Sequence, residues 1–195
     1  MAARIPAVIR GPIFGLLPFV ALLGSAILIG LNQLGVIHTA SDPVEIVGSI
    51  PSFKQGAMPP WLQVALGEYD ETRGINGNHN PRITEYQRSI PGNEKADDQS
   101  DWASAFAEWS LNKVGISGPK NKSARAWANW GREVKAPDLG AIVVFNFQGT
   151  EHVGFVLGET PDSLVVVGGN EVDRVEARRY YKRDVVTYRM PPTAH

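Results

Sequence analysis

The hydrophobic periodicity of this chain changes near Pro137, and no other feature constrains the fold as strongly. Before this point, apolar residues recur at the three- and four-residue spacing of amphipathic helices. After it, they follow a two-residue period in short runs, which is typical of strands. Because these strands are short and closely spaced, we expect them to pair antiparallel. Helices followed by an antiparallel sheet predict the α+β class.

The expected elements can be placed by their apolar runs and by the residues that end them. Asp101 is expected to cap the longest helix, and Gly115 to stop it. Four helices are predicted, at 59–66, 81–86, 102–114 and 123–130. Five strands are predicted, at 141–145, 152–157, 163–167, 172–178 and 185–188.

The N-terminal region has no charged residue from position 11 to position 36. Its densest apolar part is just long enough for a transmembrane helix, which needs about 20 residues. Arginines precede this run and acidic residues follow it, which predicts that the N-terminus is cytoplasmic. We therefore expect a signal anchor at 1–36, a linker at 37–58 and a globular domain at 59–192. The protein would be single-pass in the inner or cytoplasmic membrane, with its C-terminal domain periplasmic or extracellular.

A cleaved signal peptide is the main alternative to this anchor. Residues 24–26 are small enough for a cleavage site, but the apolar run continues directly after them. Residues 38–40 offer a second site, where the bulky His38 occupies the −3 position. Both features favour an uncleaved segment.

Composition excludes several classes of site. The chain has no cysteine, which removes disulfides and thiolate metal sites. Its formal net charge of −1 gives no positive field toward nucleic acid. Three aspartates at 97, 98 and 101 match no strong metal motif, and no glycine-rich phosphate loop follows a strand. We predict no metal, no cofactor and no nucleic-acid partner.

Three segments together offer the frame of a cysteine–histidine hydrolase. Such a site needs a nucleophile at a helix N-terminus, where the backbone dipole favours the thiolate. It also needs a histidine that acts as base and then acid, and a polar residue that orients the imidazole. This chain has a helix start at 101–103, His152 opening a strand, and Asn170 after the next strand.

The same segments resemble the NlpC/CHAP family of papain-like cysteine/histidine hydrolases, in a small bacterial and phage subgroup. Residues 101–109 are similar to the Trp-Cys-Ser/Ala-Ala-Phe signature, and 140–145 to the strand that follows it. Residues 151–156 resemble the Gly-His-Val-Gly-Phe strand, and 164–170 the segment ending in Gly-Gly-Asn. Residues 60–62 and 80–83 also match, so the likeness covers about 60–191. It implies a papain-like fold, with helices packed on the sheet, and cleavage of amide bonds in peptidoglycan.

Carried over residue by residue, the resemblance gives Ala103 the nucleophile position, His152 the base position and Asn170 the orienting position. It also makes Trp102 and Ser104 candidates for substrate binding. A methyl group cannot attack a carbonyl, so the family mechanism cannot run with alanine at 103. We therefore predict a membrane-anchored, catalytically inactive relative that binds cell-wall peptide or a protein partner.

Two other functions stay open at this point. One is an active peptidoglycan hydrolase, in which Ala103 is a substituted nucleophile or a serine attacks instead. Ser104 lies about 100° around the helix from Ala103, which disfavours it. The other is an envelope or phage assembly scaffold that uses the domain only for contacts.

Overall fold

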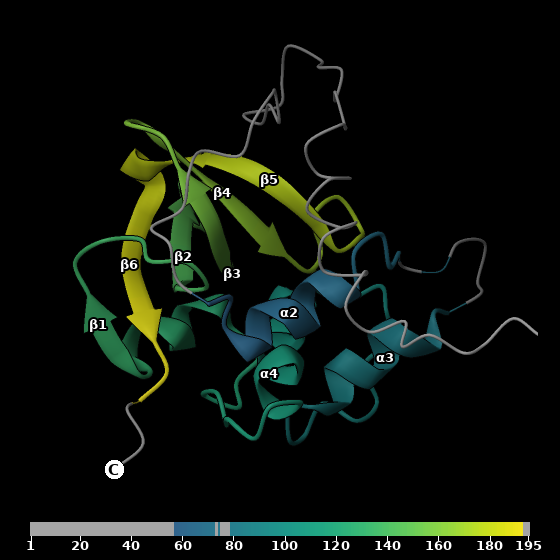
Figure 1. The fold of residues 1–195 in the computed structure, drawn as a ribbon. Helices are drawn as coiled ribbons and strands as arrows, with labels where there is room; N and C mark the ends of the chain where they lie inside the picture. Colours follow the sequence, from purple (N-terminus) through teal and green to yellow (C-terminus); the bar gives the residue numbers. More distant parts are fainter. Residues whose placement is uncertain (1–56, 73, 75–78, 193–195) are drawn as a thin grey trace, which may run out of the picture.

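The computed structural model describes residues 57–72, 74 and 79–192, which form an antiparallel sheet with helices beside it (Figure 1). The helices are α2 (Pro60–Gly67), α3 (Pro81–Arg88), α4 (Ala103–Asn112) and the short 3-10 helices η1 (Ala124–Asn129) and η2 (Lys182–Asp184). The strands are β1 (Arg132–Val134), β2 (Ile142–Phe147), β3 (Thr150–Glu159), β4 (Ser163–Gly168), β5 (Glu176–Tyr181) and β6 (Val185–Met190).

The six strands lie in the order β1-β6-β2-β3-β4-β5, and every neighbouring pair is antiparallel. Their directions rotate across the sheet, as the right-handed twist of strands requires. In Figure 1, β6 runs nearly vertically and β5 lies at a steep angle to it. The β2–β3 hairpin places His152 opposite Phe145. His152 therefore lies near the end of the sheet where this hairpin turns.

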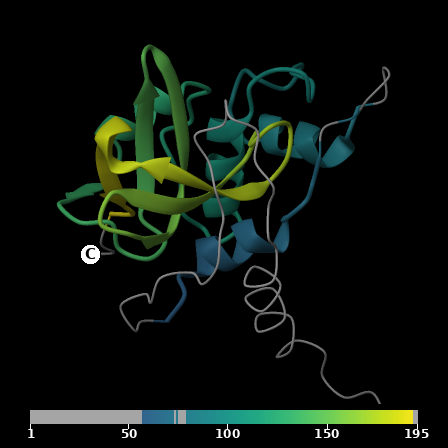
Figure 2. The same ribbon diagram turned by 90° about the horizontal axis from the view of Figure 1, so that it is seen from above.

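The three α-helices lie together to one side of the sheet, and the view from above shows the same arrangement (Figure 2). Nine residues of α4 are buried, from Ala103 to Leu111. A helix this deeply buried suits small side chains, because they let α4 approach its neighbours closely. The ring of Phe106 meets Tyr86 of α3 on one side and Phe155 of β3 on the other. These contacts join the helical half to one face of the sheet.

The opposite face of the sheet has a core of its own. Phe145 and Phe147 stack in parallel, and the ring of Tyr180 packs against both. Leu164 and Val166 of β4 complete the middle of this cluster. Strands buried on both faces read as near-continuous apolar runs, which is what 141–145 and 164–167 show.

The structure corrects the predicted sheet. It has six strands, and the additional strand β1 pairs with β6 at the edge. Its sequence, Arg-Glu-Val, is three residues long and mostly polar, so it has no recognisable period. The predicted strand at 172–178 begins only at Glu176, because Val172 and Asp173 have positive φ angles that a strand does not allow.

No helix in the described part of the chain is long and apolar enough to cross a membrane. The predicted fold, a five-stranded sheet joined to a transmembrane helix, is therefore wrong as stated. The proposed anchor at 1–36 and nearly all of the linker at 37–58 lie outside the described residues.

Candidate functional site

A cavity of about 560 Å³ opens where the start of α4 meets the end of the sheet. Four other segments complete its walls: the residues before and at the start of η1, the β2–β3 turn, the loop after β4, and the middle of β5. The predicted site residues Ala103, Ser104, His152 and Asn170 all line this cavity. Segments that are far apart in the sequence therefore converge here.

The most distinctive feature of the cavity is a hydrogen-bonded series of three polar side chains, of which Glu171 and Tyr180 are buried and His152 is partly buried. His152 Nε2 lies 2.7 Å from Glu171 Oε1, and the Tyr180 hydroxyl donates to the other oxygen of the same carboxylate. Glu171 is only 3% exposed. A carboxylate can only accept hydrogen bonds when ionised, so His152 Nε2 carries the proton. In the neutral ring, Nδ1 is then the basic nitrogen.

The charge of Glu171 favours the protonated form of the His152 imidazole. Burial lowers the pKa of His152, but the charge and the hydrogen bond of Glu171 outweigh burial and raise the pKa above its usual value. Burial and the charge of Glu171 also raise the pKa of the Tyr180 hydroxyl well above its usual range. Tyr180 therefore stays protonated and acts as a hydrogen-bond donor to Glu171.

Ala103 is the first residue of α4, where the hydrolase frame would place its nucleophile. The residue before it, Trp102, is the N-cap, and no side chain caps this helix. Asp101 was expected to cap it, but its carboxylate accepts a hydrogen bond from Asn170 Nδ2 at 3.2 Å. This bond joins the start of α4 to the loop after β4 across the cavity.

Ser104 and Trp102 have structural surroundings that limit their part in chemistry. The Ser104 hydroxyl donates to the carbonyl of Asn121 at 2.6 Å and accepts from Trp127 Nε1 at 2.7 Å. The Ser104 hydroxyl is thus engaged by two partners other than His152. Trp102 is fully buried beneath Gly169, and its ring packs against Tyr86 and Phe106.

No protein-family model and no curated protein matches this chain.

The loop after β4 contains two neighbouring polar residues, Asn170 and Glu171, that bond to different partners. Asn170, the residue predicted to orient His152, bonds to Asp101. The hydrogen-bond partner of His152 is its neighbour Glu171, and Tyr180 of β5 supports that carboxylate. Sequence reasoning missed both residues. An acidic residue directly after Gly-Gly-Asn was the available indication for Glu171, whereas Tyr180 reads as an ordinary strand residue.

The assembled groups can exchange a proton but contain no obvious attacking atom. His152 has a basic nitrogen and an oriented ring, whereas the wall at 103 presents a methyl group. Among the described residues, no cluster of three or more His, Asp or Glu side chains is arranged to hold a metal ion. This arrangement can bind a ligand and can hold or transfer a proton at His152.

Proposed function

We propose that this cavity binds a cell-wall peptide without cleaving it, as a catalytically inactive relative of peptidoglycan amidases and endopeptidases. One observation carries the proposal. An alanine begins α4 at the wall of a cavity that is also lined by the hydrogen-bonded His152–Glu171 pair. Binding and bond breaking depend on different groups, so a cleft can keep its ligand after losing its nucleophile.

The lining of the cavity suits a peptide that carries both charges. Asp101 and Glu151 are acidic, whereas Lys122 and Arg178 are basic. Apolar surface is present as well, because Val172 at the rim is 65% exposed. Ligand cavities of about 300–1,000 Å³ commonly combine an apolar wall with a few polar groups. Short wall peptides have free carboxylates, amines and methyl side chains that match these features.

Two serines line the cavity, and neither replaces the missing nucleophile. Ser104 is held by Asn121 and Trp127, as described above. The Ser123 hydroxyl accepts a hydrogen bond from the backbone N–H of Arg125 and caps η1. A serine also needs stronger activation than a thiol, because its hydroxyl is a weak nucleophile near neutral pH.

The test is to measure binding and cleavage with the same ligand. Soluble peptidoglycan peptides should bind the parent protein in isothermal titration calorimetry and be recovered intact by mass spectrometry. Replacing Val172 with Asp should weaken this binding, because it adds a charge to the exposed apolar rim. Hydrolysis by the parent protein that disappears in His152→Ala would refute the proposal, and so would a lack of binding to wall peptides.

A second candidate function is an amide hydrolase in which residue 103 replaces a cysteine. The intact His152–Glu171–Tyr180 chain favours it, because an imidazole with a fixed tautomer is the base such a nucleophile needs. The variant Ala103→Cys should then cleave cell-wall peptides. Its thiol should also react quickly with iodoacetamide near pH 6, because a neighbouring imidazolium lowers a thiol pKa.

Ala124→Cys provides the matched control for this experiment. Ala124 lines the same cavity and is 9% exposed, as Ala103 is. It should give neither hydrolysis nor fast alkylation, because it begins η1 rather than α4. Equal behaviour of the two cysteine variants, or an inert cysteine at 103, would contradict the hydrolase hypothesis. The binding experiment would still test peptide recognition separately.

A further inference from the structure

The loop that carries Glu171 has an unusual backbone. Asn170, Val172 and Asp173 have φ angles of 61°, 50° and 66°. The left-handed region is uncommon for residues other than glycine, and a β-branched residue there is an outlier. Such a strained conformation persists only where the surrounding structure holds it. Something outside this loop must therefore support it.

A short segment after α2, residues 70–72, pairs with the base of this loop; we call it the strap. Val175 donates its N–H to the carbonyl of Glu71 at 2.9 Å, and Val175 O accepts from the Asp70 N–H at 2.9 Å. Thr72 forms an isolated antiparallel bridge with Arg174. The carbonyl of Arg174 in turn accepts the N–H of Glu171 at 2.8 Å. The strap thus closes the loop directly beneath Glu171.

Asn80, the N-cap of α3, holds the strap in place. Its side-chain Nδ2 donates to the carbonyl of Thr72 at 2.5 Å and also to the carboxylate of Glu71. Its Oδ1 meanwhile accepts from the N–H of Arg82 and caps the helix. One amide group therefore ties the strap to the start of α3.

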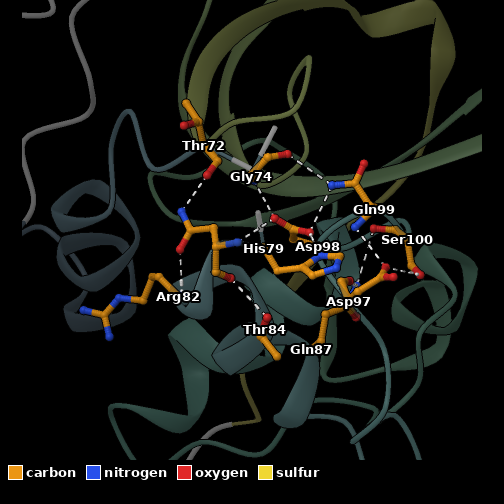
Figure 3. A network of polar contacts seen from close by, with 11 residues as sticks. Thr72, Gly74, His79, Arg82, Thr84, Gln87, Asp97, Asp98, Gln99 and Ser100 are labelled. Atoms are coloured by element: carbon orange, nitrogen blue, oxygen red, sulfur yellow. Dashed lines mark hydrogen bonds and ion pairs between the residues drawn. The ribbon is translucent and has the colours of Figure 1, made fainter. Parts of the chain in front are cut away.

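Asp98 binds both Asn80 and the chain just beyond the strap, and Figure 3 shows it beside Gly74 and His79. Its carboxylate is fully buried and accepts the N–H groups of Asn80 at 2.7 Å and Gly74 at 2.5 Å. His79 Nδ1 lies 2.6 Å away and Gln99 Nε2 3.0 Å away. Burial raises the pKa of Asp98, but these hydrogen bonds outweigh burial and hold the pKa well below its usual value. Hydrogen bonds to an ionised acceptor are stronger than those between neutral groups. Asp98 therefore holds Asn80 and Gly74 in fixed positions.

We propose that Asn80 and Asp98 are positioning residues that act through the strap to hold Glu171 against His152. The chain of contacts runs from Asp98 to Asn80, then through the strap to Arg174 and Glu171. The inference builds on the site role proposed for His152 and Glu171. It concerns the protein without ligand, so it can be tested whether or not a wall peptide binds.

The decisive variant is Asn80→Ser. Serine is also a good N-cap, so α3 keeps its cap while the strap loses both amide bonds. The substitution changes no charge, and the charges that act on His152 are those of Glu171, Arg178 and Asp101. We expect the pKa of His152, measured by NMR titration of its ring, to fall by at least about 0.5 unit, since a displaced Glu171 no longer offsets burial. Asp98→Asn should shift the pKa in the same direction.

Two controls make the outcome decisive. Glu171→Gln should lower the pKa of His152 at least as much, because it removes the charge itself. Glu85→Gln should leave it unchanged although it destabilises the protein. Glu85 bonds to Arg82 of α3 and to Trp109 and Lys113 at the end of α4, and none of these bonds involves the strap. An unchanged pKa in Asn80→Ser or in Glu171→Gln overturns the inference. An equal fall in Glu85→Gln also overturns it, because general destabilisation would then explain the shift.

Discussion

Glu171 shows at the scale of one residue how this site is organised. Both of its oxygens are engaged inside the protein, one by His152 and one by Tyr180. Taking an ionised carboxylate out of water costs on the order of several kcal/mol unless hydrogen-bond partners compensate for the lost hydration. The two donors offset that cost and keep the imidazole in one tautomer. The site therefore holds a fixed acid–base pair even though Ala103 offers no nucleophile.

Tyr180→Phe should show how much the hydrogen bond from Tyr180 to Glu171 stabilises the protein. It leaves one oxygen of buried Glu171 without a donor, and the expected loss in the free energy of unfolding is about 1–3 kcal/mol. Urea denaturation at pH 7 measures it. Tyr181→Phe is the matched control: this side chain is 39% exposed, so the change should be within about 0.5 kcal/mol. Equal losses in the two variants would show that Glu171 does not depend on the hydroxyl.

At the scale of elements, the site depends on how closely α4 approaches the end of β4. Gly169, directly after β4, sits against the side chains of Trp102 and Phe106. A Cβ atom added there would lie 2.5 Å from Phe106 Cβ and 2.7 Å from Trp102 Cζ3. The absence of a side chain therefore sets the spacing between the wall formed by α4 and the loop that carries Asn170 and Glu171.

Gly169→Ala should separate these two elements. The overpacking is expected to cost about 1–3 kcal/mol, because buried aromatic rings must move to admit the methyl group. Thermal unfolding followed by circular dichroism checks this. Gly67→Ala is the control, since nothing lies within 4 Å of the position its Cβ would take. A Gly169→Ala protein as stable as Gly67→Ala would contradict the close contact between α4 and this loop.

Over the whole molecule, ionisable groups of two kinds should give stability a maximum between acid and alkaline pH. The indole of Trp109 and then Arg82 and Lys113 lower the pKa of Glu85 to about 2, against the effect of burial. Such a carboxylate stabilises the fold above its unfolded pKa of about 4, and this contribution is lost as pH falls. Asp98 acts in the same direction.

The raised pKa of His152 acts in the opposite direction. Its contribution is fully present below its ordinary pKa of 6.5 and is lost as pH rises through the higher value in the folded protein. A hydrogen bond from Asp98 also raises the pKa of His79, which adds to the same limb.

Urea midpoints measured from pH 2.5 to pH 9 should therefore be highest between about pH 5 and 6.5. Glu85→Gln should flatten the acid limb, because it removes a group that takes up a proton on unfolding. His152→Gln should flatten the alkaline limb. Curves that keep both slopes in both variants would show that other groups set the pH dependence.

Local pattern was enough to predict much of the secondary structure. The runs at 141–145 and 163–167 lie within or beside strands β2 and β4, and the helix expected at 102–114 contains α4. The edge strand β1 was not predicted because three mostly polar residues are too short a run to show a two-residue hydrophobic period. The start of β5 was placed too early because the pattern of apolar residues does not indicate positive φ angles, such as those at 172 and 173.

The sequence by itself determined most of the helices and strands, because periodicity depends on neighbours within a few residues. It was the hydrolase frame and the family resemblance that grouped Ala103, His152 and Asn170 as candidates for one site. Only the tertiary structure decided that Glu171 bonds to His152, that Tyr180 completes the chain and that Asn80 holds the strap beneath them. Each of these contacts joins segments that the chain keeps apart, so backbone direction and burial select the partner, and no local pattern records that choice.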